Sequence, residues 1–264
     1  MANTSPTPII FTKAIDNFFS GITKSFDFAF LFWKQVFKRP FHLQEVIHQC
    51  YEIGVKSLPL ITLTGFIIGI VFTKQSRPSL EDFGATSWLP SLMGIAIMKA
   101  LGPLVTALIC AGKVGSAIGA ELGSMRVTEQ IDAMEVSAIN PFKFLVVTRV
   151  TATLITIPLL TFYCITVGLL GSYVNIHAEE ATSFTSFFKN SFSTISFLHL
   201  FTSVLKSLVF GFSIGIIGCY KGWNAVQGTR GVGKAANEAV VMAMFIIFVE
   251  EIIIVQISNW IHYY

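Results

Sequence analysis

Residues 228–234 read GTRGVGK, which satisfies the GxxxxGK pattern of a phosphate-binding loop. Such a loop follows a strand and opens a helix, and a Ser or Thr directly after the Lys holds Mg²⁺. Here Ala235 occupies that position, and the segment joins two long apolar stretches. We therefore expect no ATP binding in this segment and interpret it as a flexible basic turn that leads into the last apolar stretch.

Four charged residues, Lys99, Lys206, Glu250 and Glu251, lie inside long apolar runs, where isolated charges are costly in a membrane. At 1.5 Å per residue, Lys206 lies ~10 Å, the two glutamates ~12 Å and Lys99 ~15 Å inside the same end of their spans. Such depths allow Lys–Glu pairs that fasten helices together, or a polar patch along the path of an anionic lipid headgroup. Adjacent glutamates point about 100° apart, so at most one comfortably faces a given partner.

The remaining reactive side chains form no constellation. The 5 histidines and 4 cysteines are scattered singly, without metal-ligand spacing or a nucleophile–base arrangement. We expect no catalytic residue, metal or cofactor in this chain. The formal charge of +3 does not indicate a nucleic-acid partner.

Composition indicates a membrane protein, because 53% of the 264 residues are hydrophobic and only 12% are charged. That charged share is about half the usual value for soluble domains. The mean hydropathy is +0.69. Five stretches reach the roughly 20 residues that cross a bilayer, and we predict an all-α membrane domain over 51–264 with spans at about 53–73, 89–112, 144–173, 197–220 and 238–259.

Residues 1–50 differ from the spans. Within 11–50, aromatic and aliphatic residues recur at helical spacing and are interrupted by lysines, which favours an amphipathic helix in the membrane interface. Its apolar residues are Phe18, Phe19, Ile22, Phe26, Phe30, Trp33 and Phe37. A second amphipathic helix is predicted in the external segment at about 178–196.

Lys and Arg are distributed unevenly between the two ends of the spans. Thirteen lie before the first span or in the second and fourth connections, against three in the first and third connections. By the positive-inside rule the N-terminus lies in the cytoplasm, and five spans place the C-terminus outside. Glycines four residues apart, such as Gly65/Gly69 and Gly211/Gly215, favour close helix packing, and Pro59, Pro103 and Pro158 predict kinks.

The second connection predicts a short cytoplasmic helix at about 124–138. Thr128 is suited to cap it, and Asn140-Pro141 to stop it. Ile131, Met134 and Ile139 form an apolar edge, and Glu129, Asp132 and Glu135 an acidic one. Such a helix either docks into a groove of a partner or remains a solvated loop helix.

Residues 121–135, ELGSMRVTEQIDAME, resemble the signature of the MlaE-type permease family, the membrane subunit of MCE-associated ABC transporters. Residues 51–60, YEIGVKSLPL, and 231–241, GVGKAANEAVV, agree with it. Met134 replaces the Leu that is more usual there, a swap of similar volume. The resemblance implies that 124–138 is a coupling helix in contact with an ATPase subunit, and that this contact uses Glu121, Arg126, Glu129, Gln130, Ile131, Asp132, Met134 and Glu135.

The resemblance further implies a homodimer in a bacterial-type inner membrane, with two cytoplasmic ABC ATPase subunits that bind ATP and Mg²⁺ and an external MCE-domain lipid-binding protein. The assembly would move phospholipid or a related lipid between the inner membrane and the outer envelope. Import and export both fit this arrangement. The alternative is a membrane scaffold that assembles an envelope complex and moves nothing itself.

Overall fold

The computed structural model describes residues 27–39, 41–226 and 228–263. It divides the chain into two compact units, 1–41 and 42–264, so the division falls ahead of the predicted boundary at residue 50. In the first unit, residues 27–36 form a helix whose Phe30 and Trp33 are exposed. Phe18, Phe19, Ile22 and Phe26 of the predicted amphipathic segment lie outside the described residues.

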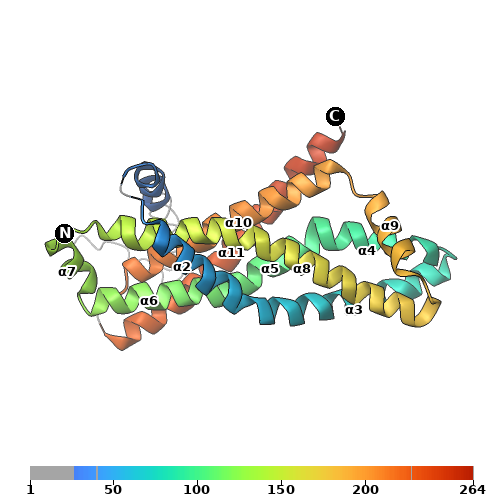
Figure 1. Cartoon of the computed structure of the whole chain (residues 1–264), viewed down its shortest axis with the longest axis horizontal. Coiled ribbons are helices and arrows are strands. Elements are labelled where there is room, and N and C mark those ends of the chain that lie inside the picture. The colour runs from blue at the N-terminus through green and yellow to red at the C-terminus, as the bar shows by residue number, and fades with distance from the viewer. Residues whose placement is uncertain (1–26, 40, 227, 264) are drawn as a thin grey trace, which may run out of the picture. The chain divides into compact units, whose positions relative to one another are not determined.

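The second unit is helical over nearly its whole length (Figure 1). Five of its helical runs are long and apolar enough to cross a membrane. They confirm the predicted all-α class with five spans. The elements are α2 (Leu43–Gly54), η1 (Val55–Ser57), α3 (Leu58–Asp82), η2 (Thr86–Trp88), α4 (Leu89–Ala96), η3 (Ile97–Leu101), α5 (Gly102–Cys110), η4 (Ala111–Gly115), α6 (Ser116–Val127), α7 (Gln130–Val136), η5 (Phe142–Val147), α8 (Thr148–Glu180), α9 (Phe184–Ser193), α10 (Phe197–Trp223) and α11 (Thr229–Tyr263).

Helix α8 lies at the centre of this unit and packs against α2, α3, α5 and α10. Its contact with α3 is close because glycines lie on both sides: a methyl group added at Gly69 would lie 2.0 Å from the Gly168 carbonyl oxygen. At the contact with α10, a methyl group at Gly215 would lie 2.4 Å from Thr153 Oγ1. The predicted small-residue pairs therefore lie where backbones approach.

The three prolines predicted to kink the spans lie at two kinds of position. Pro59 and Pro103 occupy the first turns of α3 and α5, where a missing N–H costs little, and Pro158 lies inside α8. An irregular turn precedes each of these two prolines. It is the 3₁₀ turn η1 ahead of Pro59 and the π turn η3 ahead of Pro103. Two further π turns occur at η4 and η5, and each of the three contains a lysine: Lys99, Lys113 and Lys143.

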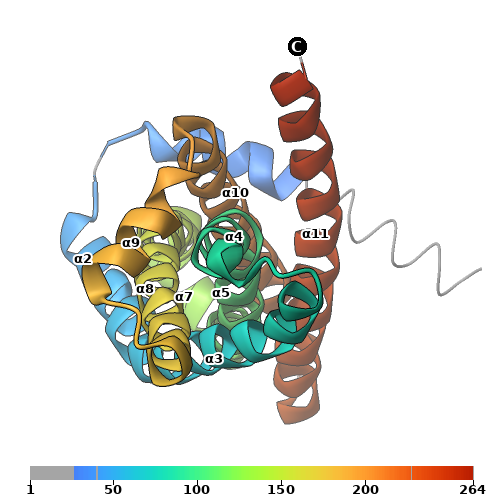
Figure 2. The ribbon, with the colours of Figure 1, turned by 90° about the vertical axis from the view of Figure 1, so that its right-hand side faces the viewer.

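The segment at about 178–196, which was predicted to be external, contains α9. This helix begins after Ser183, whose side chain accepts a hydrogen bond from the Ser186 N–H at 3.3 Å. Viewed along the long axis, α9 lies beside α4 (Figure 2). Ser191 donates to the Pro90 carbonyl at 3.0 Å, and Phe187 is fully buried in a cluster with Met93 and Ile176. One face of α9 therefore belongs to the core of the unit.

Helix α11 begins at Thr229, well before the predicted span at 238, so the basic turn predicted at 228–234 is wrong. The segment is helical because it packs on α6, where Gly119 and Gly123 let Ala235, Ala239 and Val232 approach. A phosphate-binding loop requires non-helical backbone at its own glycines. In the GTRGVGK segment, Gly231 and Gly233 instead lie in the first turns of α11.

Candidate functional site

The second connection consists of the end of α6, a tight reversal and the seven-residue helix α7. The predicted cap is wrong: Thr128 completes the last turn of α6, where its hydroxyl donates to the Ser124 carbonyl at 2.8 Å. The residue before α7 is Glu129, which adopts the left-handed conformation with φ 60° and makes no side-chain cap. This left-handed residue reverses the chain between the two helices.

The predicted stop at Asn140-Pro141 is also wrong. Helix α7 ends earlier, at Val136, and the chain turns away at Ala138 with φ 60°. There the Ile139 N–H donates to the Met134 carbonyl and the Ala138 N–H to the Glu135 carbonyl, both at 3.0 Å. This pair of bonds is a Schellman motif, which usually has Gly at the left-handed position. Asn140 instead caps the next helix, since its side-chain oxygen accepts from the Lys143 N–H at 3.1 Å.

The acidic side chains of this segment face outward. Glu129, Asp132 and Glu135 are exposed, as is Gln130. Asp132 binds Arg126 at 2.5 Å, an exposed ion pair that holds α7 against the end of α6. The segment thus presents carboxylates to solvent or to a partner protein at this end of the membrane domain.

Some apolar residues of the segment are buried against the bundle, and others are exposed. Ile131 is 0% exposed and packs within the chain, and Met134 is half-buried. Val136, at 89% exposed, and Ile139, at 45%, point away from the bundle. The apolar surface open to a partner is therefore formed by Val136 and Ile139.

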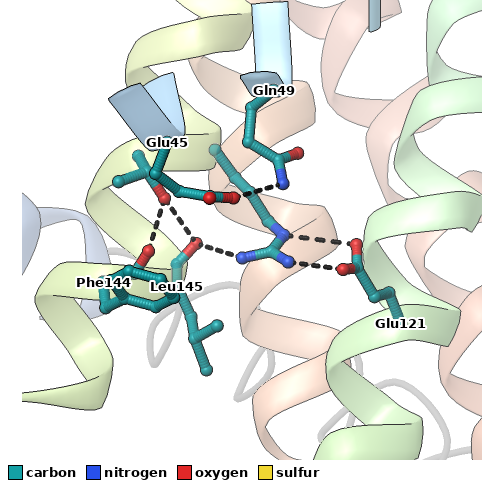
Figure 3. Close-up of polar contacts among 7 residues, drawn as sticks. Glu45, Gln49, Glu121, Phe144 and Leu145 are labelled. Atoms are coloured by element: carbon teal, nitrogen blue, oxygen red, sulfur yellow. Dashed lines mark hydrogen bonds and ion pairs between the residues drawn. The ribbon is translucent and has the colours of Figure 1, made fainter. Parts of the chain in front are cut away.

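Glu121 lies in α6, ahead of this connection, and binds Arg149 of α8 (Figure 3). Arg149 donates from Nη2 to Glu121 Oε1 at 2.6 Å, from Nε to Oε2 at 3.4 Å and from Nη1 to the Leu145 carbonyl at 3.0 Å. The arginine is 2% exposed, whereas the Glu121 side chain is 52% exposed. Arg149 is one of the thirteen Lys and Arg that indicate the orientation, and its pairing was not predicted. Its position at the edge of an apolar run is a sequence signal for a carboxylate partner, because a buried guanidinium needs one.

Within the membrane region, Lys206 of α10 is fully buried and its ammonium binds Glu251 Oε1 of α11 at 2.5 Å. The same ammonium donates to the carbonyl oxygen of Lys99 at 3.1 Å. Lys99 belongs to the π turn η3, and a π turn has wider hydrogen bonding than an α-helix. Three elements therefore meet at one buried cation.

The neighbouring carboxylate takes a different partner. Glu250 accepts a hydrogen bond from Ser213, two turns from Lys206 on α10, so both glutamates reach the same helix at different levels. Lys99 donates to the Asn259 side-chain oxygen at 3.4 Å. Ser213 and Asn259 were not predicted, because uncharged polar residues in an apolar run carry no distinctive signal.

The second carboxylate oxygens of Glu250 and Glu251 are buried without a hydrogen-bond partner among the described residues. Each retains capacity for a donor, such as water or the headgroup of a lipid. In the described ranges, no group of three His, Cys, Asp or Glu side chains is placed to hold a metal ion.

Comparison with known proteins shows which family this chain resembles. The family model described as Permease MlaE matches residues 46–257. A probable ABC transporter permease protein of Rickettsia prowazekii is 35% identical over 231 residues, which cover 87% of this chain and 89% of that protein. The intermembrane phospholipid transport system permease protein MlaE of Haemophilus influenzae is 31% identical over 209 residues, 78% of this chain and 79% of that protein.

A third relative is a probable ABC transporter permease protein of Synechocystis. It is 35% identical over 206 residues, which cover 78% of each chain. The family match extends from α2 to α11, so it includes both the α6–α7 connection and the buried charges.

Proposed function

The chain belongs to the MlaE permease family, and from this membership we propose that it is the membrane subunit of an ABC transporter for phospholipid or a related lipid. The names of its relatives support the proposal: they are ABC transporter permeases, and one belongs to an intermembrane phospholipid transport system. Lipid would move between the inner membrane and the outer envelope, driven by ATP and Mg²⁺ bound to a separate ATPase subunit.

The observation that carries the proposal is the outward acidic edge of the α6–α7 connection. Glu129, Asp132 and Glu135 are exposed at the tip of this connection, next to the exposed Val136. Carboxylates around an apolar side chain suit a groove with basic or donor groups at its rim. A displacement of α7 by the ATPase would reach α8 through α6 and the Glu121–Arg149 pair.

The outer faces of the spans support a proposed homodimer. Phe245, Phe248, Ile252 and Ile253 of α11 are each 45% exposed or more, and α3 exposes Leu63 to 60%. Such faces lie against lipid or against a second copy of the chain. We place the N-terminus in the cytoplasm and the C-terminus outside, with an MCE-domain protein on the outer side.

The test uses the assembled complex of permease, ATPase and MCE-domain protein in proteoliposomes. Glu129→Gln and Glu135→Gln together remove two exposed charges, and we expect lipid-stimulated ATP hydrolysis to fall by about tenfold, which is the ratio that about 1.4 kcal/mol produces. Asp82→Asn removes an exposed charge after the first span and should leave the rate unchanged. Equal rates of ATP hydrolysis with the unaltered permease, the double variant and Asp82→Asn would contradict the coupling role of the α6–α7 connection.

Lipid transfer distinguishes the transporter from the alternative scaffold. The complex should transfer fluorescent phospholipid between donor and acceptor membranes only with ATP. If the complex assembles and hydrolyses ATP without any transfer, the scaffold interpretation replaces the transporter.

A further inference from the structure

A pocket of about 400 Å³ lies between the α2–η1 segment and the η4–α6 segment. The pocket lies at the end of the spans that is nearer α7. Lys113 lines the pocket, and the Lys99 carbonyl contacts Lys206. At 1.5 Å per residue the pocket and the Lys206–Glu251 pair are therefore about 20 Å apart along the second span. The run from Leu43 to Asp82 has 40 residues, about 60 Å of helix, whereas a hydrocarbon core is ~30 Å thick. The α2 side of the pocket therefore lies at the level of the lipid headgroups.

The pocket contains charges of both signs. Lys56 and Lys113 line it with Glu52 and Glu121. Lys56 binds Glu52, and the Lys56 side chain is 57% exposed. Lys113 donates to the Lys56 carbonyl oxygen, and over the described ranges it has no carboxylate in ion-pair contact. The Lys113 ammonium is thus available to an anion.

An unpaired hydroxyl lies in the same wall. Ser57 is 0% exposed, and within the described part of the chain its Oγ has no hydrogen-bond partner. A buried hydroxyl without a partner is energetically costly, so such groups normally bind a water or a ligand. This second observation indicates a site with an occupant.

We propose that this pocket binds the headgroup of an ethanolamine phospholipid in the membrane leaflet on the α7 side. The phosphate would meet Lys113 and Lys56, and the primary ammonium would donate to Glu52 and Glu121. The volume lies within the range of roughly 300–1,000 Å³ that is usual for small-ligand sites. Next to the pocket, Tyr51 and Val55 expose apolar surface along which acyl chains can remain in lipid.

This site goes beyond the transport proposal, since it requires only that the chain lie in a membrane. Binding here and failure of lipid transfer are separate outcomes. The same phosphate and ammonium chemistry occurs in a soluble molecule, glycerophosphoethanolamine, so the test must separate the lipid from the soluble source.

The test places the photo-crosslinking residue benzoylphenylalanine at Ala117, an exposed residue of the pocket wall, in full-length protein in nanodiscs. The nanodiscs hold equal amounts of phosphatidylethanolamine, phosphatidylcholine and phosphatidylglycerol. The reference probe replaces the lipid-facing Leu63. Mass spectrometry should find phosphatidylethanolamine enriched about tenfold at Ala117 relative to Leu63, the ratio for about 1.4 kcal/mol. Choline cannot replace it, because its quaternary nitrogen donates no hydrogen bond.

Two variants identify the two halves of the site. Lys113→Met should lower the total lipid adduct at Ala117, and Glu52→Gln should remove the preference for ethanolamine over choline. Lys189→Met, at an exposed position of α9, should change neither. Equal lipid composition at Ala117 and Leu63 overturns the proposal. Loss of the adduct on addition of inorganic phosphate or glycerophosphoethanolamine also overturns it, since the site would then take a soluble ligand.

Discussion

Arg149 in α8 is almost completely buried, whereas Glu121 in α6, to which it donates two hydrogen bonds, is about half exposed. The two charges therefore differ in what they lose when the partner is removed. If Glu121 is removed, the buried guanidinium of Arg149 has no water nearby to take the place of the carboxylate. If Arg149 is removed, the exposed carboxylate of Glu121 is hydrated by solvent. This pair joins the helix before the α6–α7 connection to the central helix of the bundle.

We predict an asymmetric result when each partner is removed. Glu121→Leu should lower the free energy of unfolding by about 3 kcal/mol, and Arg149→Leu by only about 1 kcal/mol. Equilibrium unfolding in mixed micelles measures both. Lys234→Met, which breaks an exposed pair with Glu238, should cost less than about 1 kcal/mol. Equal costs for Glu121→Leu and Arg149→Leu would contradict the assigned burial.

The Lys206–Glu251 pair gives a second prediction. Lys206→Met leaves Glu251 without its cation and should destabilise the fold by about 3 kcal/mol, whereas Lys206→Met with Glu251→Leu should regain most of that loss. The double variant, once folded, is then assayed for lipid transfer. Loss of transfer assigns the charges to the lipid pathway, and normal transfer assigns them to helix attachment alone.

Close backbone contact predicts opposite effects for two glycines. Gly69→Ala would place a methyl group against the Gly168 carbonyl, so α3 and α8 must separate, at about 3 kcal/mol. Gly233 in α11 has no heavy atom within 4 Å of an added methyl group. Gly233→Ala should therefore stabilise by about 0.5–1 kcal/mol through helix propensity. Thermal unfolding of both variants checks the signs, and destabilisation by Gly233→Ala would be inconsistent with this helix.

The left-handed Ala138 predicts a stabilising substitution. An L-residue with a Cβ pays about 1 kcal/mol in this conformation, so Ala138→Gly should slow hydrogen exchange of the α7 amides by about fivefold. The control is Ala133→Gly, at an exposed position inside α7, which should speed exchange. Faster exchange in both variants would argue against the Schellman end.

Membrane orientation can be tested with two exposed positions. Phe83, 84% exposed after α3, and Val136, 89% exposed at the end of α7, lie on opposite sides in our proposal. In intact spheroplasts of a Cys50→Ser background, an impermeant maleimide should label Phe83→Cys but reach Val136→Cys only after lysis. The reverse pattern would invert the topology.

The spans could be predicted because long apolar runs have few alternatives in a membrane protein. Their full helical lengths could not: α11 extends to Thr229 and η5–α8 covers Phe142–Glu180, since polar helix ends beyond the lipid leave no hydropathy signal. The π turns were missed because a single additional residue in an apolar helix does not alter composition.

The connection shows a similar division. Its acidic edge followed from helical spacing, but its caps did not, because Thr128 satisfies its hydroxyl within α6 and a left-handed Glu129 makes the turn. The identity of Glu121 as the partner of Arg149 depends on tertiary contact between α6 and α8, which local sequence patterns do not reveal. Lys206 and Glu251 were predicted at similar depths, and the structure places them in contact.

The π turns at η3, η4 and η5 have a consequence for how the length of this chain can change in evolution. Deleting one residue from an α-helix rotates everything beyond it by about 100°, which would turn an apolar face away from its neighbours. A π turn already holds one residue more than the α-helical register requires. Homologues one residue shorter at 97–101, 111–115 or 142–147 could therefore keep every downstream contact in register.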